Sequence, residues 1–270
     1  MAVPPEAARR KFGLEVRRRR EKAGLPQKRL ADTVPMSQSM LSGIELGQKT
    51  PKREFVAAID HVLTAGGALL RKWDAMASAD GFPDWFRDVA ELERQATEIW
   101  EYHPLLIPGL LQTEEYIAAI IRSGNPAIAE SELGEQVRAR LKRQEVLQRN
   151  DAPLLLAVLD ELWLHRAVGS REIMRGQMER LVEASESPRV TIQVVPGETL
   201  RHPGHDGAFK LITVPERGQV VYTETRASGY SHEDDETIED YTRVFADLRG
   251  AALPEEASRN LLGKIVEEYE

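Results

Sequence analysis

The sequence predicts two domains: an all-α domain over residues 1–80, followed by an α+β (mixed α/β) domain over residues 81–270. In the first part, apolar residues recur at helical spacing between Gly and Pro breaks. Short apolar runs that suit buried strands occur only in the second part, where they alternate with helical patterns. Turn-forming residues gather in SADGFP, 78–83, and mark the predicted boundary. The chain's 270 residues also exceed what one small core usually requires.

Charge divides along the chain in the same way. Residues 1–53 hold 13 Lys/Arg and 5 Asp/Glu, a balance of +8, and the remainder has a balance of −16. We call residues 1–53 the basic head and the remainder the acidic body. This division of charge indicates that only the head binds a polyanion. The run RRRR at 17–20 is equally consistent with a solvated helix face.

Composition excludes several classes of site. The chain has no cysteine, which excludes disulfides, zinc thiolates and a thiol nucleophile. The N-terminus lacks the apolar run of a signal peptide, and no segment approaches the roughly 18 apolar residues that a membrane span needs. We therefore expect a cytoplasmic protein that does not enter a membrane.

The N-terminal domain is expected to be a run of short helices. The first ends at Gly24, and the second starts after Pro26 and continues to about Thr33. Ser37 is placed to cap a third helix that Gly47 closes. Two further helices follow Pro51 and Gly66-Gly67, with apolar residues at helical spacing.

The second and third of these helices are separated by a tight break, and the third is rich in Gln and Ser. This arrangement is typical of a helix-turn-helix. In such a motif the second helix places its N-terminal turns against base edges in the major groove. Gln can pair with adenine, Ser can bond to most bases, and basic side chains bind phosphates on either side.

The stretch GLPQKRLADTVPMSQSMLSGIELGQKTP resembles the lambda-repressor/Cro-like (XRE) helix-turn-helix family, over roughly residues 8 to 63. Pro26, Pro35 and Arg19 depart from the family's usual pattern. The resemblance implies base reading from the third helix, backbone contacts around it and a structural role for Glu45. The residues assigned to double-stranded DNA are Gln27, Lys28, Ser37, Gln38, Ser39, Ser42 and Lys49. One short helix reads few base pairs, so we expect a homodimer on two half-sites.

The second domain mixes helical and strand patterns. A helix is expected over 85–100, and Thr113 is placed to cap another. Strands at 154–159 and 190–195 enclose a helix and so can be parallel. A hairpin is expected at 209–214 and 219–223. The remaining expected helices are 130–149, 172–185, 235–248 and 255–269.

Several motifs in this domain, chief among them LLIPGLLQTEEYIAAII and VTIQVVP, resemble the effector domain of actinobacterial WhiJ-type, antitoxin-like transcriptional regulators. The resemblance covers about residues 85–262. It implies transcription regulation and a small partner protein encoded nearby, with no known ligand or reaction.

The segment from 100 to 116 is the candidate docking surface for such a partner. Its two prolines hold the chain extended and remove backbone donors. The side chains assigned to partner binding are Trp100, Tyr102, Leu105, Ile107, Leu110 and Tyr116. The alternative is that these residues pack in the core or between the domains.

Catalysis is not expected. HPGHD brings His202, His205 and Asp206 together but matches no helical metal motif, and Glu161 with His165 is an ordinary helical pair. We therefore expect no catalytic residue, metal or cofactor. The alternative is a DNA-tethered enzyme, which a pocket of converging, perturbed titratable groups would favour.

Overall fold

The computed structural model describes residues 6–77, 84–225 and 228–269. The chain divides into two compact units, Met1–Asp84 and Trp85–Glu270. The boundary predicted at 78–83 lies outside the described residues.

The first unit is all-α in its described part, as predicted. Its helices are α1 (Glu6–Lys22), α2 (Gln27–Thr33), α3 (Gln38–Glu45), α4 (Arg53–Val62) and α5 (Ala68–Ala77). Leu30, Leu41 and Ile59 are among the side chains that fill its core. Gly47 follows α3 with a φ of 71°, a left-handed conformation that glycine adopts at little cost.

Two local features set the packing of these helices. A Cβ on Gly13 of α1 would lie 2.2 Å from the carbonyl oxygen of Ile44 in α3, so only glycine allows the two helices to approach this closely. The buried carboxylate of Asp60 accepts hydrogen bonds from the N–H groups of Gly67 (2.6 Å) and Leu69 (2.7 Å). Asp60 thereby satisfies free donors at the start of α5.

The second unit contains a six-stranded mixed sheet in the order β3-β2-β1-β4-β5-β6. Its strands are β1 (Glu98–His103), β2 (Leu154–Asp160), β3 (Val190–Val195), β4 (Phe209–Val214), β5 (Gly218–Glu224) and β6 (Gly229–His232). Strands β1, β2 and β3 run parallel, and β4, β5 and β6 pair antiparallel. The predicted parallel pair and the predicted hairpin are both confirmed.

Strand β1 corrects the helix expected over 85–100. The helix α6 (Asp84–Gln95) ends earlier, and the chain then enters the sheet. Ile99 pairs with Leu155 of β2 on one side and with Ile212 of β4 on the other, which makes β1 an interior strand. Pairing with distant segments therefore overrides the helical spacing of the local apolar residues.

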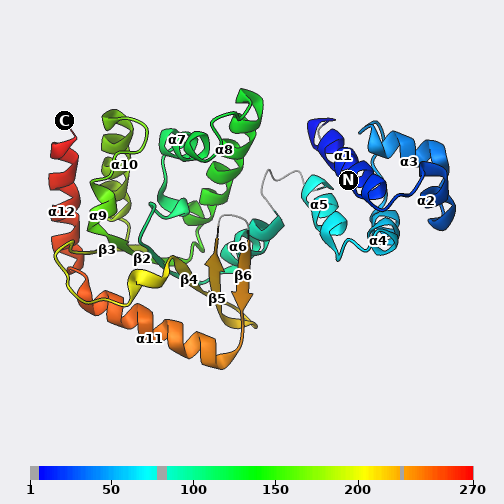
Figure 1. Cartoon of the computed structure of the whole chain (residues 1–270). Helices are drawn as coiled ribbons and strands as arrows, with labels where there is room; N and C mark the ends of the chain where they lie inside the picture. Colours follow the sequence, from blue (N-terminus) through cyan, green and yellow to red (C-terminus); the bar gives the residue numbers. More distant parts are fainter. Residues whose placement is uncertain (1–5, 78–83, 226–227, 270) are drawn as a thin grey trace. The chain divides into compact units, whose positions relative to one another are not determined.

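Helices cover both faces of the sheet (Figure 1). Helix α11 (Asp235–Ala251) packs Phe245 and Leu248 against one face. The other face carries a larger core that includes Met178 and Leu262. The helices on that side are α6, α7 (Glu114–Gly124), α8 (Glu130–Gln144), α9 (Glu161–Leu164), α10 (Arg171–Ala184) and α12 (Glu255–Glu268). Across the described ranges, no helix is long and apolar enough to cross a membrane.

Candidate nucleic-acid interface and buried charged pocket

Ser37 fixes the start of α3. Its Oγ accepts a hydrogen bond from the N–H of Met40 (3.1 Å) and lies 3.0 Å from the Oγ of Ser39. The side chain of Ser37 is therefore the N-cap that its sequence position predicts. The same hydroxyl would therefore have to keep this capping bond while it makes the contact with DNA that we assigned to it.

Helix α3 has an apolar inner face and a polar outer face. Leu41 and Ile44 are fully buried, whereas Gln38 and Ser39 are exposed and Ser42 is half-buried. Gln38 and Ser42 lie one turn apart and so share one side of the helix. The three side chains assigned to base reading therefore reach the surface of α3 together.

Lys28 and Lys49, both assigned to the DNA backbone, are exposed near the two ends of the motif. Lys28 lies in the first turn of α2, and Lys49 follows α3. A Cβ on Gly43 would lie 2.8 Å from Cδ of Lys49, so the aliphatic stem of this lysine packs along α3. The stem thus holds its ammonium group close to the polar face of the helix.

Glu45 binds α1, α2 and α3 together. Its Oε1 accepts from Nε of Arg20 (2.6 Å), and its Oε2 accepts from Nη2 of Arg20 (3.0 Å) and from the amide of Gln27 (2.7 Å). The network buries Arg20 and Glu45. Glu45 has the structural role expected for it, and Gln27, assigned to the DNA backbone, also serves this network.

The second unit holds a buried charged cluster that the sequence analysis missed. Glu93 of α6 accepts from Nε and Nη2 of Arg143 in α8, and the Nη2 bond is 2.8 Å. The ammonium of Lys210 in β4 lies 3.0 Å from Oε1 of Glu93 and 2.8 Å from Oε1 of Glu101 in β1. All four side chains are at most 8% exposed.

Burial alone would raise the pKa of Glu93, but Arg143 and Lys210 outweigh burial and lower this pKa to about 2. Burial and the nearby carboxylates of Glu101 and Glu93 instead raise the pKa of Glu224 at the end of β5, although Lys210 opposes the shift. The pKa values of these two carboxylates, which belong to one cluster, are thus shifted in opposite directions.

A small cavity opens beside this cluster, with Glu101, His103, Lys210, Tyr222 and Glu224 in its lining. It leaves about 10 Å³ for the centre of a water-sized molecule, which is room for about one such molecule. Burial lowers the pKa of His103 to about 4, so the imidazole is neutral near pH 7. A site of converging, perturbed groups therefore exists in this domain.

A sequence signal for this cluster was present. Lys210 interrupts the apolar run AFKLITV, and Glu101 interrupts IWEYH. A charged residue inside a buried strand requires a partner, because an unpaired charge is costly to bury. The partners Glu93 and Arg143 are distant in sequence, so no local motif displays the set.

The predicted docking segment lies largely in the core. Tyr102, Ile107, Leu110 and Tyr116 are at most 3% exposed, and they pack with strands and helices of the same unit. Trp100 is half-buried and stacks on Phe245 of α11, with ring centroids 5.2 Å apart. Leu105 alone among the six is exposed, at 54%. As folded here, the segment does not form the exposed docking surface that we predicted, and the core-packing alternative describes it.

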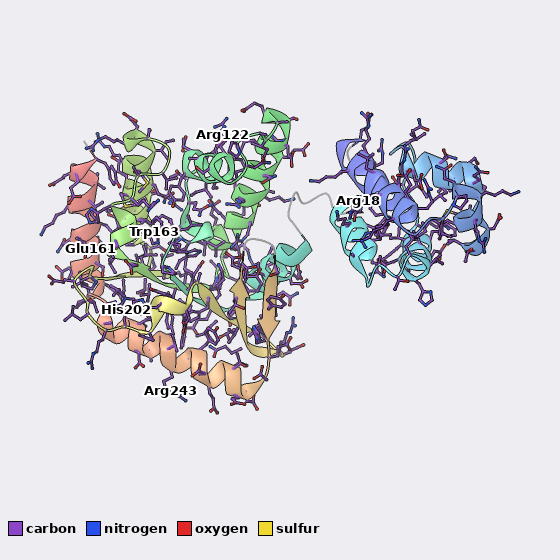
Figure 2. All side chains as sticks on the ribbon, viewed as in Figure 1. Arg18, Arg122, Glu161, Trp163, His202 and Arg243 are labelled. Carbon is purple, nitrogen blue, oxygen red and sulfur yellow. The ribbon has the colours of Figure 1, made fainter. Side chains whose placement is uncertain are left out.

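The HPGHD loop joins β3 to β4, and Figure 2 labels its His202. The rings of His202 and His205 lie 4.5 Å apart, and Nδ1 of His202 accepts from the N–H of Gly204. The described residues include no group of three or more His, Cys, Asp or Glu that could hold a metal ion.

The pair Glu161 and His165 makes ordinary surface contacts. Glu161, which Figure 2 also labels, accepts a hydrogen bond from the N–H of Gly197, and His165 contacts Glu268 at the surface.

Comparison with family models gives two matches. The model described as a domain of unknown function (DUF5753) matches residues 86–264. A model described as a helix-turn-helix domain matches residues 11–73 and so includes α2 and α3. Comparisons with curated proteins and with solved structures returned no match.

Proposed function

The chain belongs to the family defined by the domain of unknown function DUF5753, here preceded by a helix-turn-helix domain, and on this premise we propose that it is a sequence-specific, DNA-binding transcriptional regulator. The observation that carries the proposal is the outer face of α3. There Gln38, Ser39 and Ser42 reach the surface, while the one carboxylate of the helix, Glu45, is held inside by Arg20.

The positions of the basic residues support this proposal. Lys28 and Lys49 are exposed at the two ends of the motif, where they can neutralise phosphates on either side of the groove. The acidic balance of the rest of the chain would repel the DNA backbone. The head is therefore proposed to bind the duplex and the body to remain off it.

We further propose that the protein acts as a homodimer and that residues 81–270 form an effector domain of the WhiJ-type, antitoxin-like kind. The dimer follows from the short reach of one recognition helix, which favours two half-sites about one helical turn apart. The resemblance of LLIPGLLQTEEYIAAII and VTIQVVP to such effector domains supports the effector role, and the domain's acidic balance would suit a small basic or polar partner protein or a ligand.

The proposal is tested by measuring the affinity of full-length variants for a cognate and a random duplex over a range of salt. Gln38→Ala should weaken the binding free energy by about 1–3 kcal/mol on the cognate duplex only, because a base contact carries the sequence preference. Lys49→Ala should weaken both duplexes alike and reduce the salt slope by about one unit.

Lys264→Ala is the matched control, because it removes an exposed lysine from α12 in the other unit. It should leave both affinities and the salt slope unchanged. Equal losses on both duplexes for Gln38→Ala would contradict the assignment of α3 as the reading helix.

A DNA-tethered enzyme is the second candidate, and the pocket beside Lys210 is the observation that favours it. We propose a binding site there in preference to an active site. Lys210 and Glu101 hold each other in an ion pair, and the cavity has room for about one water-sized molecule. Neither feature supplies the near-attack geometry that a reaction on a larger substrate requires.

A further inference from the structure

Two carboxylates in the cavity lining, Glu101 and Glu224, have oxygens without a hydrogen-bond donor. Glu101 is 1% exposed, and its Oε2 is buried with no hydrogen-bond partner. Glu224 is half-buried, and its carboxylate forms no hydrogen bond or ion pair with any described residue. Both line the same cavity. A fully buried oxygen without a partner, such as Oε2 of Glu101, is rare in native proteins, since it loses solvation without compensation.

The hydrogen bonds that the structure gives Lys210 and His103 go to other atoms than these oxygens. The ammonium of Lys210 is directed to Oε1 of Glu93 and to Oε1 of Glu101. The imidazole of His103 accepts from the N–H of Leu106 through Nδ1 (3.1 Å), and burial keeps it neutral.

Charge in the lining favours a cation. Its ionisable groups are Glu101 and Glu224 against Lys210, so the lining carries one excess negative charge when Glu224 is ionised. Behind the lining, Glu93 and Arg143 neutralise each other. Arg140 of α8 lies within electrostatic range of Glu224 but is not part of the lining.

From this geometry we propose that the cavity binds a primary ammonium group, whose N–H donors bond to Oε2 of Glu101 and to the carboxylate of Glu224. The available space fits one heavy atom with its hydrogens and is too small for a guanidinium or a quaternary ammonium. A water molecule could bond to the same oxygens but would leave the excess charge uncompensated. Charge-assisted bonds to both carboxylates are the stronger arrangement.

The ammonium group can belong to a free alkylamine or to a lysine side chain of a partner, because the cavity holds only the head of either. This inference deepens the proposed function. Its biological meaning rests on the effector role proposed for this domain. The binding itself does not depend on that role. It is therefore measured without DNA, so that a failure of DNA binding and a failure of amine binding are distinct results.

The test is isothermal titration calorimetry of the full-length protein with n-butylammonium chloride, and with tetramethylammonium chloride at equal ionic strength. Saturable binding is expected for n-butylammonium alone. Glu224→Gln should weaken it at least about tenfold, because one charge-assisted bond is lost. Glu239→Gln, an exposed change on α11, should bind like the wild type.

The melting temperature of Glu224→Gln, measured alongside, shows whether that variant is folded. Affinity should also fall as pH drops through the raised pKa of Glu224, since the protonated carboxyl no longer attracts a cation. A blocked lysine (Nα-acetyl-lysine methylamide) that binds as tightly as n-butylammonium indicates a protein lysine as the source. Binding of the free alkylamine alone indicates a small amine. No saturable binding of n-butylammonium, or equal binding by Glu224→Gln, would overturn the inference.

Discussion

Each unit of the molecule buries a charged network, and the two networks differ in how completely they are satisfied. In the first unit, both oxygens of Glu45 accept hydrogen bonds from Arg20, and Gln27 supplies one more. In the second unit, Glu93 is satisfied in the same way. Its neighbour Glu101 has one satisfied oxygen and one without a partner.

We interpret this difference as one between a structural role and the proposed ligand-binding role. A fully satisfied buried network fixes the arrangement of the elements that contribute to it. The Glu45 network joins α1, α2 and α3, and so fixes the angle at which α3 is presented. An incompletely satisfied network leaves a buried oxygen without a hydrogen-bond donor, and a bound ligand can supply that donor.

The largest expected effect comes from breaking the satisfied part of the second network. Glu93→Gln should lower the free energy of unfolding by about 3–5 kcal/mol, because Arg143 and Lys210 lose a buried counter-charge. Urea unfolding measures the loss. Glu91→Gln on the same helix removes an exposed partner of Arg94 and should cost less than about 1 kcal/mol. Similar losses in the two variants would remove the distinction.

Acid should act on the same group. The folded state holds the pKa of Glu93 at about 2, below its ordinary value of 4.5, so its ionised form favours folding. This contribution is complete above about pH 4.5 and is lost as pH falls toward 2, at a cost on the order of 3 kcal/mol. Unfolding free energies measured between pH 6 and 3 should show a decline that Glu93→Gln reduces. An identical decline in that variant would contradict the assignment.

A smaller loss is expected from the first network. Glu45→Gln retains the shape of the side chain but removes its charge beside Arg20. It should lower the free energy of unfolding of the first unit by about 2 kcal/mol. DNA affinity should fall as well, because α2 and α3 lose their common anchor. Helical circular dichroism during urea unfolding reports the stability. Glu54→Gln, an exposed change on α4, is the control.

The smallest effect has the opposite sign. A raised pKa for Glu224 means that its ionised form opposes folding, so this group adds stability as pH falls through its folded pKa. At pH 7, Glu224→Gln should leave stability unchanged or raise it by less than about 1 kcal/mol. A clear loss of stability in urea unfolding would mean that Glu224 has a partner in the folded protein, and the contrast between the networks would weaken.

Local patterns in the sequence predicted the elements whose signals are local. Ser37 and Gly47 bound α3 as their capping chemistry requires. Thr113 caps α7 through the N–H of Tyr116. The two-domain fold class and the parallel pairing of β2 with β3 also followed from the order of the patterns.

Strand β1 and the charged pocket could not be predicted in this way. Strand β1 is buried on both faces and carries Glu101 between Trp100 and Tyr102, so it has no simple alternation of apolar and polar residues. The charge of Glu101 is paired with Lys210, which is more than a hundred positions away in the sequence. The same long-range pairing draws the predicted docking segment into the core, where Leu110 and Tyr116 are buried.

The most direct test of the central claim, that α3 reads DNA, is selection of bound duplexes from a random-sequence pool by the full-length protein and by Gln38→Ala. The wild type should enrich a near-palindromic site with half-sites about one helical turn apart. Gln38→Ala should enrich the same site with preference lost at one base position in each half. A pool that remains random with the wild type, or identical sites for both proteins, would contradict the account.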